Sequence, residues 1–434
     1  MSKIKNKNPF LSLSLSFKIL TFIGFLLTFA FLILKAPIYT PDTYSYSNME
    51  VSRFPGYVIC INVFKLIFGK ANFDVYLVGF NLIFGFVAIN YALKKISELF
   101  KLHVWAKMVL FLLFLSPYLS TLYIANNLTS EGLAYPLYLL TFSFAVEFLF
   151  YNKRRKLYFL IIALILLILT RGQFVIIPFI VAFMFCIKHK KAVFKKANIY
   201  FLILLLTVPL WASTLDKTYR KILYDEFEVS PYSYIAAITL PLFVSKQENM
   251  VLLEHQDDKN IFEFSYKRID SLNLLSSKVA GTCYDKYMVF HNNFPLICNQ
   301  NIHNQGVKYY INKGFSIPKS YVLIEKSCKR MMPILIKNNF KEYISIYFTN
   351  VLYGFKSIMI VLVLGLVLVF SLYKSIKEFN QVNGVLLLAT LLIISNSLIV
   401  AIACHSINRY LFYNYFLGVL IIIILAKKLI TKLK

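Results

Sequence analysis

The chain has 434 residues, of which 59% are hydrophobic and 17% aromatic, and its mean hydropathy is +0.65. A soluble domain of this length does not need so much apolar surface, and several apolar runs are long enough to cross a bilayer. The formal net charge of +27 would suggest a nucleic-acid partner in a soluble protein, but here the lysines cluster between the apolar runs. Such clusters are typical of topology signals and lipid contacts, so we expect a lipid bilayer and no nucleic acid as partner.

The apolar runs predict an all-α polytopic membrane protein with about ten transmembrane helices. The first run follows a basic segment, is too long for a signal peptide and has no A-x-A cleavage site, so we expect a retained anchor. Two runs separated by "TRGQ" are short, which predicts a kinked or re-entrant pair or a locally thin bilayer. The predicted helices are 17–36, 73–93, 107–124, 131–151, 157–170, 172–187, 198–215, 355–373, 383–402 and 410–430.

The short loops on one side of these helices are rich in lysine and arginine, whereas those on the other side are nearly free of lysine. The positive-inside rule requires this distribution and assigns the basic side to the cytoplasm. We therefore expect both termini to be cytoplasmic, which fits an even number of spans. The basic loops read "KKISELFKLHVWAK", "NKRRK", "KHKKAVFKK" and "KSIKEFNQ".

The helices and the long polar segment predict three parts. Residues 1–215 form an N-terminal transmembrane module with an outer loop at 37–72, within which 56–70 is predicted to be an interfacial helix. Residues 216–354 carry 13 of the 20 acidic residues and form an outer-side soluble domain, inserted before the last three helices, 355–434. Its end, from "RMMPILIKNN" onward, is amphipathic, and at most one disulfide can form among Cys283, Cys298 and Cys328.

Few charged residues remain at the outer ends of the membrane helices once the cytoplasmic loops and 216–354 are set aside. Positive residues are disfavoured on that side, so the arginines there need a reason. Arginine binds phosphate through a planar fork of charged donors, and a neighbouring carboxylate can act as general base on a hydroxyl. The set predicts glycosyl transfer from a lipid-phosphate-linked sugar, and it consists of Asp42, Glu50, Asp74, Glu131, Arg53, Arg171 and Arg409.

Each of these residues also has a purely structural interpretation. Asp42 fits a turn or a helix cap, and Glu131 fits the first turn of a helix, where a carboxylate interacts favourably with the dipole. The three arginines fit interfacial anchors that extend to headgroups. The tyrosines of 39–57 fit an aromatic belt, and His405 fits a structural role. Their coincidence on one face is what favours a site, and a site requires that they lie close together in the fold.

Four segments together resemble the GT-C glycosyltransferases, the integral membrane enzymes that use polyprenyl-phosphate sugars. The outer loop "PDTYSYSNMEVSRFPGY" is similar to the D-x-Y and R-x-P-G-Y elements of that family, and "LTSEGLAYPLYLL" is similar to its second acidic motif. "LILTRGQFVIIP" and "HSINRYLFYNYF" resemble its two arginine motifs, although Gly172 stands where a proline often follows and the late proline is absent. The layout matches over about 17–210 and 383–425, and 216–354 has no recognisable counterpart.

The resemblance implies a role for each matched residue. Asp42 would be the catalytic base, which gives inversion at the anomeric carbon, and Glu131 would assist it or hold an acceptor group or a metal. The donor phosphate would be bound by Arg171, Arg409 and His405, and other substrate contacts would come from Tyr44, Arg53 and Tyr410. Some members use a divalent cation such as Mg or Mn. The outer carboxylates, Asp42 and Glu131 among them, permit such a cation and do not demand one.

We therefore expect an inverting transferase in a bacterial inner membrane, with its active site facing the periplasm. It would move a sugar from a polyprenyl (undecaprenyl) phosphate donor to a cell-envelope glycan or a lipid A-like glycolipid acceptor. An O-antigen ligase or polymerase combines similar features, but "HSINRYLFYNYFLG" does not fit its histidine motif well. A lipid-linked sugar flippase or transporter is the non-enzymatic alternative, and it would favour midplane charges and repeats, which this sequence lacks.

Overall fold

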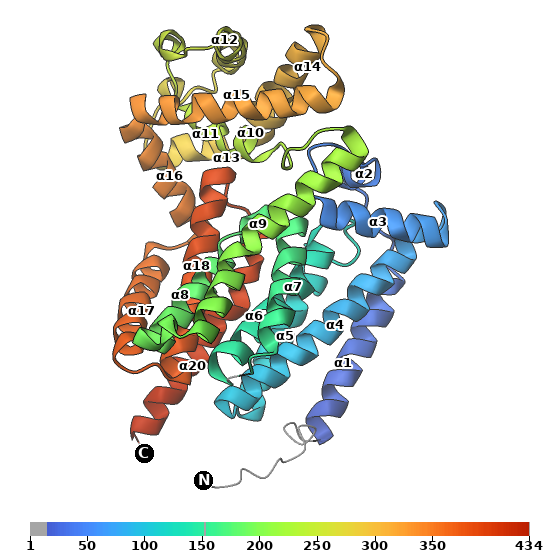
Figure 1. Ribbon diagram of the computed structural model, residues 1–434, viewed down its shortest axis with the longest axis vertical. Helices are drawn as coiled ribbons and strands as arrows, with labels where there is room; N and C mark the ends of the chain where they lie inside the picture. Colours follow the sequence, from blue (N-terminus) through green and yellow to red (C-terminus); the bar gives the residue numbers. More distant parts are fainter. Residues whose placement is uncertain (1–14, 152, 434) are drawn as a thin grey trace.

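A computed structural model describes residues 15–151 and 153–433, and over these residues the fold is helical and contains no β-strand. One isolated bridge pairs Ile38 with Asn127. The long helices form a bundle, and a second group of helices caps one end of it (Figure 1). Helix α1 starts, and α20 ends, at the end of the bundle away from that cap (Figure 1). The expected all-α class is therefore confirmed for the described residues.

The N-terminal part supplies nine helices of the described chain. Two of them, α2 and α3, are short and lie near the cap end of the bundle (Figure 1). The bounds are α1 Leu15–Ile33, α2 Pro41–Ser47, α3 Pro55–Phe68, α4 Phe73–Phe100, α5 Val104–Leu119, α6 Glu131–Phe150, α7 Lys156–Thr170, α8 Ile177–His189 and α9 Lys196–Tyr224. The C-terminal part adds α17 Ile358–Lys377, α18 Gln381–Ala403, α19 Asn408–Leu411 and α20 Tyr415–Leu433.

Eight helices of the described chain are long and apolar enough to cross a membrane. Each of the ten predicted runs contains a helix. Helix α8 reaches spanning length only together with the helical turns on either side of it, over Gly172–Phe194, whereas α5 has 16 residues and α7 has 15. At 1.5 Å per residue these two extend only about 24 and about 22 Å, against roughly 30 Å of hydrocarbon. The structure thus supports a multi-pass membrane protein with eight candidate spans, and the count of ten remains a prediction.

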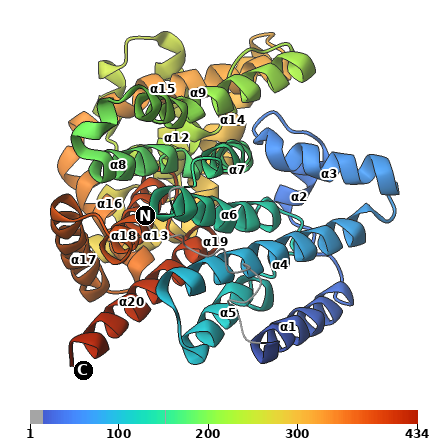
Figure 2. The ribbon, with the colours of Figure 1, turned by 60° about the horizontal axis from the view of Figure 1, so that its bottom comes forward.

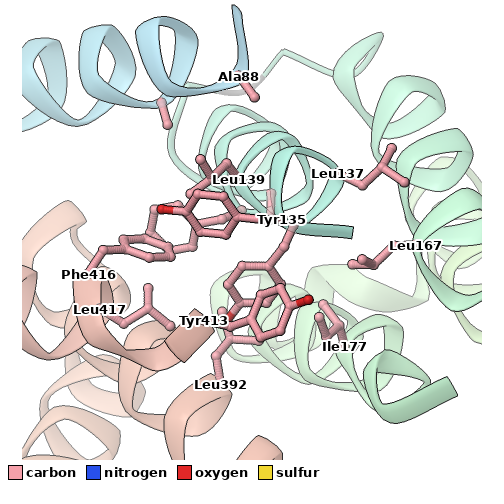
Figure 3. Close-up of a cluster of buried hydrophobic side chains, with 14 of the residues drawn as sticks. Ala88, Tyr135, Leu137, Leu139, Leu167, Ile177, Leu392, Tyr413, Phe416 and Leu417 are labelled. Atoms are coloured by element: carbon pink, nitrogen blue, oxygen red, sulfur yellow. The ribbon is translucent and has the colours of Figure 1, made fainter. Parts of the chain in front are cut away.

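Burial separates central from peripheral helices in the bundle. In its most apolar window, 78% of the residues of α6 are buried, against 22% in α1 and in α17. Figure 2 accordingly shows α6 inside the bundle and α1 and α17 at its edges. A helix that is apolar all round is buried by its neighbours, and α6 has this character. In the core, Tyr135 of α6 and Tyr413 before α20 lie among leucines from several helices (Figure 3).

The cap has its own hydrophobic core, formed by residues of 235–351 together with Ala401 of α18. Its helices are α10 Ser233–Ala237, α11 Thr239–Phe243, α12 Gln256–Ser271, α13 Cys283–Ile297, α14 Asn304–Asn312, α15 Ile317–Asn338 and α16 Phe340–Phe355. We call these helices, together with the segments that join them and Tyr232 just before α10, the outer domain. The cysteines of the described chain are free thiols, including Cys283, Cys298 and Cys328.

The structure places two predicted features at the edges of the segment 216–354. Helix α9 continues without a break to Tyr224, so the domain boundary placed at 215/216 falls inside a helix. A hydropathy window predicts the end of a helix where its composition becomes polar, although the helical backbone hydrogen bonds of α9 continue beyond that point. The amphipathic segment after residue 330 is the end of α15 and the whole of α16, separated at Asn339.

Candidate functional site

Asp42 lies in the first turn of a short helix, α2, for which the sequence had left a turn or a helix cap open. Thr40 caps α2, since its side chain accepts from the Thr43 amide while Thr43 Oγ1 accepts from the Thr40 amide at 3.0 Å. Pro41 occupies the first helical position, where its missing N–H costs nothing. Asp42 is therefore in the first turn, and Tyr46, four residues later, lies on the same face.

The loop after α2 is held by the end of α9. Arg220 donates to the backbone carbonyl of Arg53 at 2.8 Å and to that of Val51. Its guanidinium is buried and pairs with Asp216 at 3.2 Å. Ser230, whose backbone N–H donates to Asp216 at 2.7 Å, completes this network. Arg220 thus fixes the backbone from which the Arg53 side chain extends. The sequence did not predict this role, because residue 220 falls in the segment 216–354 that was expected to form a separate domain.

Two glycines allow the segment that carries Arg53 to touch the segment that carries Arg171. A Cβ on Gly56, at the start of α3, would lie 2.6 Å from Thr170 Oγ1 and 2.9 Å from the Leu169 backbone. A Cβ on Gly172 would lie 2.6 Å from the Phe54 ring. The chain around Arg53 therefore packs directly against the turn that carries Arg171. Glycine at position 56 allows a close approach to the Leu169 backbone, and glycine at position 172 leaves room for the Phe54 ring.

The charged residues of the outer helix ends form one connected cluster. Arg53 donates to Asp42 Oδ1 at 2.7 Å, and Arg409 donates to Asp42 Oδ2 at 2.6 Å. Arg409 also pairs with both carboxylate oxygens of Glu131, through Nε to Oε1 and through Nη2 to Oε2 at 3.2 Å. Arg171 donates to Glu131 Oε1 at 2.6 Å. Two carboxylates and three guanidiniums from four distant segments therefore meet, and we call them the outer charge cluster.

The two sides of this cluster differ in exposure. The Glu131 side chain is only 3% exposed and lies behind the arginines, whereas Asp42 lines a cavity. Gln173 accepts from Arg171 Nε at 3.3 Å and donates to Asn396 at 3.1 Å, which ties the arginine turn to α18. Glu131 is thus placed to hold Arg171 and Arg409 in position, while Asp42 can be reached by a ligand.

The cavity has a volume of about 700 Å³ and lies between the bundle and the outer domain. A volume of this order is within the range of ligand sites in proteins. One side of the cavity is charged and is lined by residues of the outer charge cluster and by Glu50, whereas an apolar side is formed by the last residues of α18. The residues of that charged side are Asp42, Glu50, Arg53, Arg171 and Arg409, and the apolar ones are Ile399, Val400, Ile402 and Ala403.

The aromatic residues predicted for substrate binding have different places. Tyr410 lines the cavity, and its ring lies 5.1 Å from the Arg171 guanidinium carbon. Tyr44 does not line it, is 58% exposed and packs on the Tyr39 ring. Tyr46 takes that position instead, with Arg53 4.9 Å above its ring, because helical spacing rather than loop geometry places it beside Asp42.

His405 lines the cavity but makes no contact with the charge cluster. Its ring stacks on Phe294, with centroids 4.7 Å apart, and its Nδ1 lies 2.9 Å from the carbonyl of His291. Burial and the neighbouring His291 lower the pKa of His405 to about 4. A neutral imidazole cannot neutralise a phosphate by charge, so its contribution there is limited to a hydrogen bond.

The protonation of Asp42 follows from its two partners. Burial alone would raise the pKa of its carboxyl, but Arg53 and Arg409 outweigh burial and leave that pKa below its ordinary value. Asp42 is therefore ionised at neutral pH. Each of its oxygens accepts one hydrogen bond, and a carboxylate oxygen has two lone pairs, so each retains room for a further donor.

The predicted alternative of a divalent cation at Asp42 and Glu131 does not match this arrangement. The Arg409 guanidinium lies between the two carboxylates and bonds to both. Among the residues that the structure describes, no group of three or more His, Cys, Asp or Glu side chains is placed to hold a metal ion. The donor set thus fits an anion better than a cation.

Most of the site residues predicted from the sequence line the cavity, and Glu131 lies directly behind them. Those that line it are Asp42, Arg53, Arg171, Arg409, His405 and Tyr410. It missed the residues that the outer domain contributes, because nothing in their local pattern distinguishes them. Comparison with known proteins adds no assignment, since no family model, curated protein or solved structure matches this chain.

Proposed function

We propose that this protein is an inverting glycosyltransferase that uses a polyprenyl (undecaprenyl) phosphate sugar at the outer face of a bacterial inner membrane. The observation that carries the proposal is the outer charge cluster on a cavity of about 700 Å³ beside an apolar helix end. The acceptor is a hydroxyl of a cell-envelope glycan or glycolipid. The resemblance of the four sequence segments to GT-C enzymes points the same way.

The donor phosphate binds at Arg171 and Arg409, where forked guanidinium donors match phosphate oxygens. A phosphate that engages Arg409 competes with Asp42 for its donors and frees lone pairs on Asp42 Oδ2. The partly apolar wall of α18 accommodates the first isoprene units. Glu131 acts as a positioning residue, since it holds both arginines from behind.

The transfer is a single displacement. The acceptor hydroxyl oxygen forms a bond to the anomeric carbon, and the bond from that carbon to the phosphate oxygen breaks. The electron pair leaves with the polyprenyl phosphate, whose growing negative charge Arg171 and Arg409 stabilise. The hydroxyl proton passes to Asp42, which is ionised before the reaction. Attack opposite to the leaving group inverts the anomeric configuration.

The test is mass spectrometry of envelope glycans from a deletion strain complemented with wild type, Asp42→Asn or Asp74→Asn. Loss of a general base costs about 10²- to 10⁴-fold in rate, so Asp42→Asn should leave the glycan as unmodified as the deletion does. Asp74 is the matched control, because it is an outer acid bonded to Tyr39 at 2.9 Å and does not line the cavity. Normal glycan in the Asp42→Asn strain would remove Asp42 as the base.

A further inference from the structure

The two walls of the cavity differ in charge. The membrane-side wall carries the outer charge cluster, whereas the polar residues that the outer domain contributes are uncharged. A ligand that fills both halves must therefore combine an anionic group with a neutral, hydrogen-bonding group. The uncharged polar residues are Tyr232, Ser233, Tyr234, Asn299 and His303.

An unusual backbone turn presents two of these residues. Cys298–His303 forms a π-helical turn between α13 and α14. Such turns are rare and are found frequently at functional sites. Asn299 and His303 lie at the start and the end of this turn, and both line the cavity.

His303 has an unused hydrogen-bonding atom. The residue is 9% exposed, and over the described chain its Nε2 has no hydrogen-bond partner. Burial of an unpaired polar atom costs free energy, so such an atom calls for a partner that binds there. The ring is held between Tyr232 and Tyr321, in edge-to-face contacts with centroids 5.4 and 5.2 Å away. Its position is therefore set before any ligand arrives.

The chemistry of this wall suits hydroxyl groups. Burial and the nearby Arg53 lower the pKa of His303 to about 4, so its imidazole is neutral at pH 7 and can donate or accept a hydrogen bond without a charge. The Tyr232 hydroxyl donates to the side-chain oxygen of Asn299, Oδ1, which leaves the side-chain NH₂ group of Asn299 free to donate to a ligand. A neutral wall with both donors and acceptors matches a hydroxyl, which is itself a donor and an acceptor.

We propose that His303, together with Asn299, binds a hydroxyl of a sugar ring held between the outer domain and the charge cluster. The inference rests on the proposed transferase function and specifies how its sugar is recognised. The sugar is either the one carried by the lipid phosphate or the one that presents the acceptor hydroxyl. A site that bonds a hydroxyl discriminates strongly against a ligand without it, since its polar atoms are then left unpaired.

The test compares His303→Phe with His303→Gln. Phenylalanine keeps a ring between the two tyrosines without a nitrogen, and glutamine keeps a neutral amide near the Nε2 position. Binding to the purified full-length protein in detergent is measured for undecaprenyl phosphate, alone and carrying glucose, galactose or mannose. In parallel, the same variants are expressed in the deletion strain and envelope glycans are quantified. Unchanged thermal unfolding of both variants establishes that they fold.

If His303 binds the carried sugar, wild type should prefer one sugar-bearing carrier over bare undecaprenyl phosphate. His303→Phe should then lose about tenfold of that preference, while affinity for the bare carrier is unchanged and His303→Gln retains it. If it binds the acceptor sugar, carrier binding is unchanged and glycan transfer falls only in His303→Phe. A variant with normal carrier preference and normal transfer overturns the inference alone. A wild-type protein that binds no carrier overturns the proposed function as well.

Discussion

Two buried carboxylates on one helix have different surroundings. Glu131 at the start of α6 is 3% exposed and pairs with Arg171 and Arg409, whereas Glu147 near its end is 1% exposed and pairs with three lysines. Those lysines, Lys95, Lys153 and Lys156, lie 3.2 to 3.3 Å from its oxygens.

The comparison shows that a buried ion pair is not in itself a functional site. Lysine is a flexible point charge that can turn its ammonium to water, and Lys153 is 51% exposed. Arginine offers a rigid fork, and the arginines beside Glu131 line a cavity that contains a second carboxylate, Asp42. We therefore propose ligand binding at the Glu131 end of α6 and a role in stability for the Glu147 end.

The largest effect is expected for Glu131→Gln. It removes the anion shared by two partly buried guanidiniums, and breaking such a buried pair costs about 3–5 kcal/mol. Glycan transfer should fall as well, because Arg171 and Arg409 lose their common support. Thermal unfolding in detergent and glycan analysis measure the two effects. Glu50→Gln is the control, since Glu50 is exposed on the same cavity and should change stability by less than about 0.5 kcal/mol. Equal stability of the two variants would contradict the account.

A smaller and separable effect is expected for Glu147→Gln. Lys153 and Lys156 are partly exposed, and glutamine still accepts from the Tyr91 hydroxyl, so the loss of stability should be about 1–3 kcal/mol. Envelope glycan transfer should remain normal once the protein is folded. Loss of transfer at normal protein abundance would remove the distinction between the two ends of α6.

A third buried carboxylate forms no ion pair with any residue that the structure describes, and we expect it to give the smallest effect. Glu325 of α15 accepts from the backbone N–H groups of Tyr234 and Ile235 at 2.8 and 3.0 Å, and burial raises its pKa to about 7. A raised carboxyl pKa stabilises the fold below the ordinary value of 4.5, and this stabilisation is lost as pH rises through about 7.

The measurement is thermal unfolding of wild type and Glu325→Gln between about pH 4.5 and 7.5. The wild type should lose a few degrees relative to Glu325→Gln across this window, because the glutamine stays neutral. A constant difference between the two proteins would show that Glu325 does not titrate there.

Much of the bundle could be predicted from the sequence because apolar runs and basic loops are local signals. The four charged residues that meet, Asp42, Glu131, Arg171 and Arg409, could be identified because charges are scarce at outer helix ends. Scarcity does not give geometry, however. Asp42 lies on helix α2, so Tyr46, four residues later, rather than Tyr44 lines the cavity.

The fold of the outer domain could not be predicted from local sequence patterns. Three of its helices, α10, α11 and α14, have fewer than ten residues, and its core forms between residues far apart in the chain, such as Ile235 and Ile346. The π-helical turn that carries His303 has no sequence signature. Nothing in the sequence around Arg220 indicates that its side chain binds the backbone of the loop at Arg53. Tertiary contacts determine both positions.

The most direct test of the central claim is equilibrium binding of undecaprenyl phosphate and of undecaprenol to the purified wild type and to Arg409→Lys. Lysine keeps the charge near Glu131 but loses the forked donors. The account predicts that wild type binds the phosphate and not the alcohol, and that Arg409→Lys binds the phosphate at least about tenfold more weakly. Equal binding of phosphate and alcohol by wild type, or full phosphate affinity in Arg409→Lys, would contradict the assignment of the outer charge cluster.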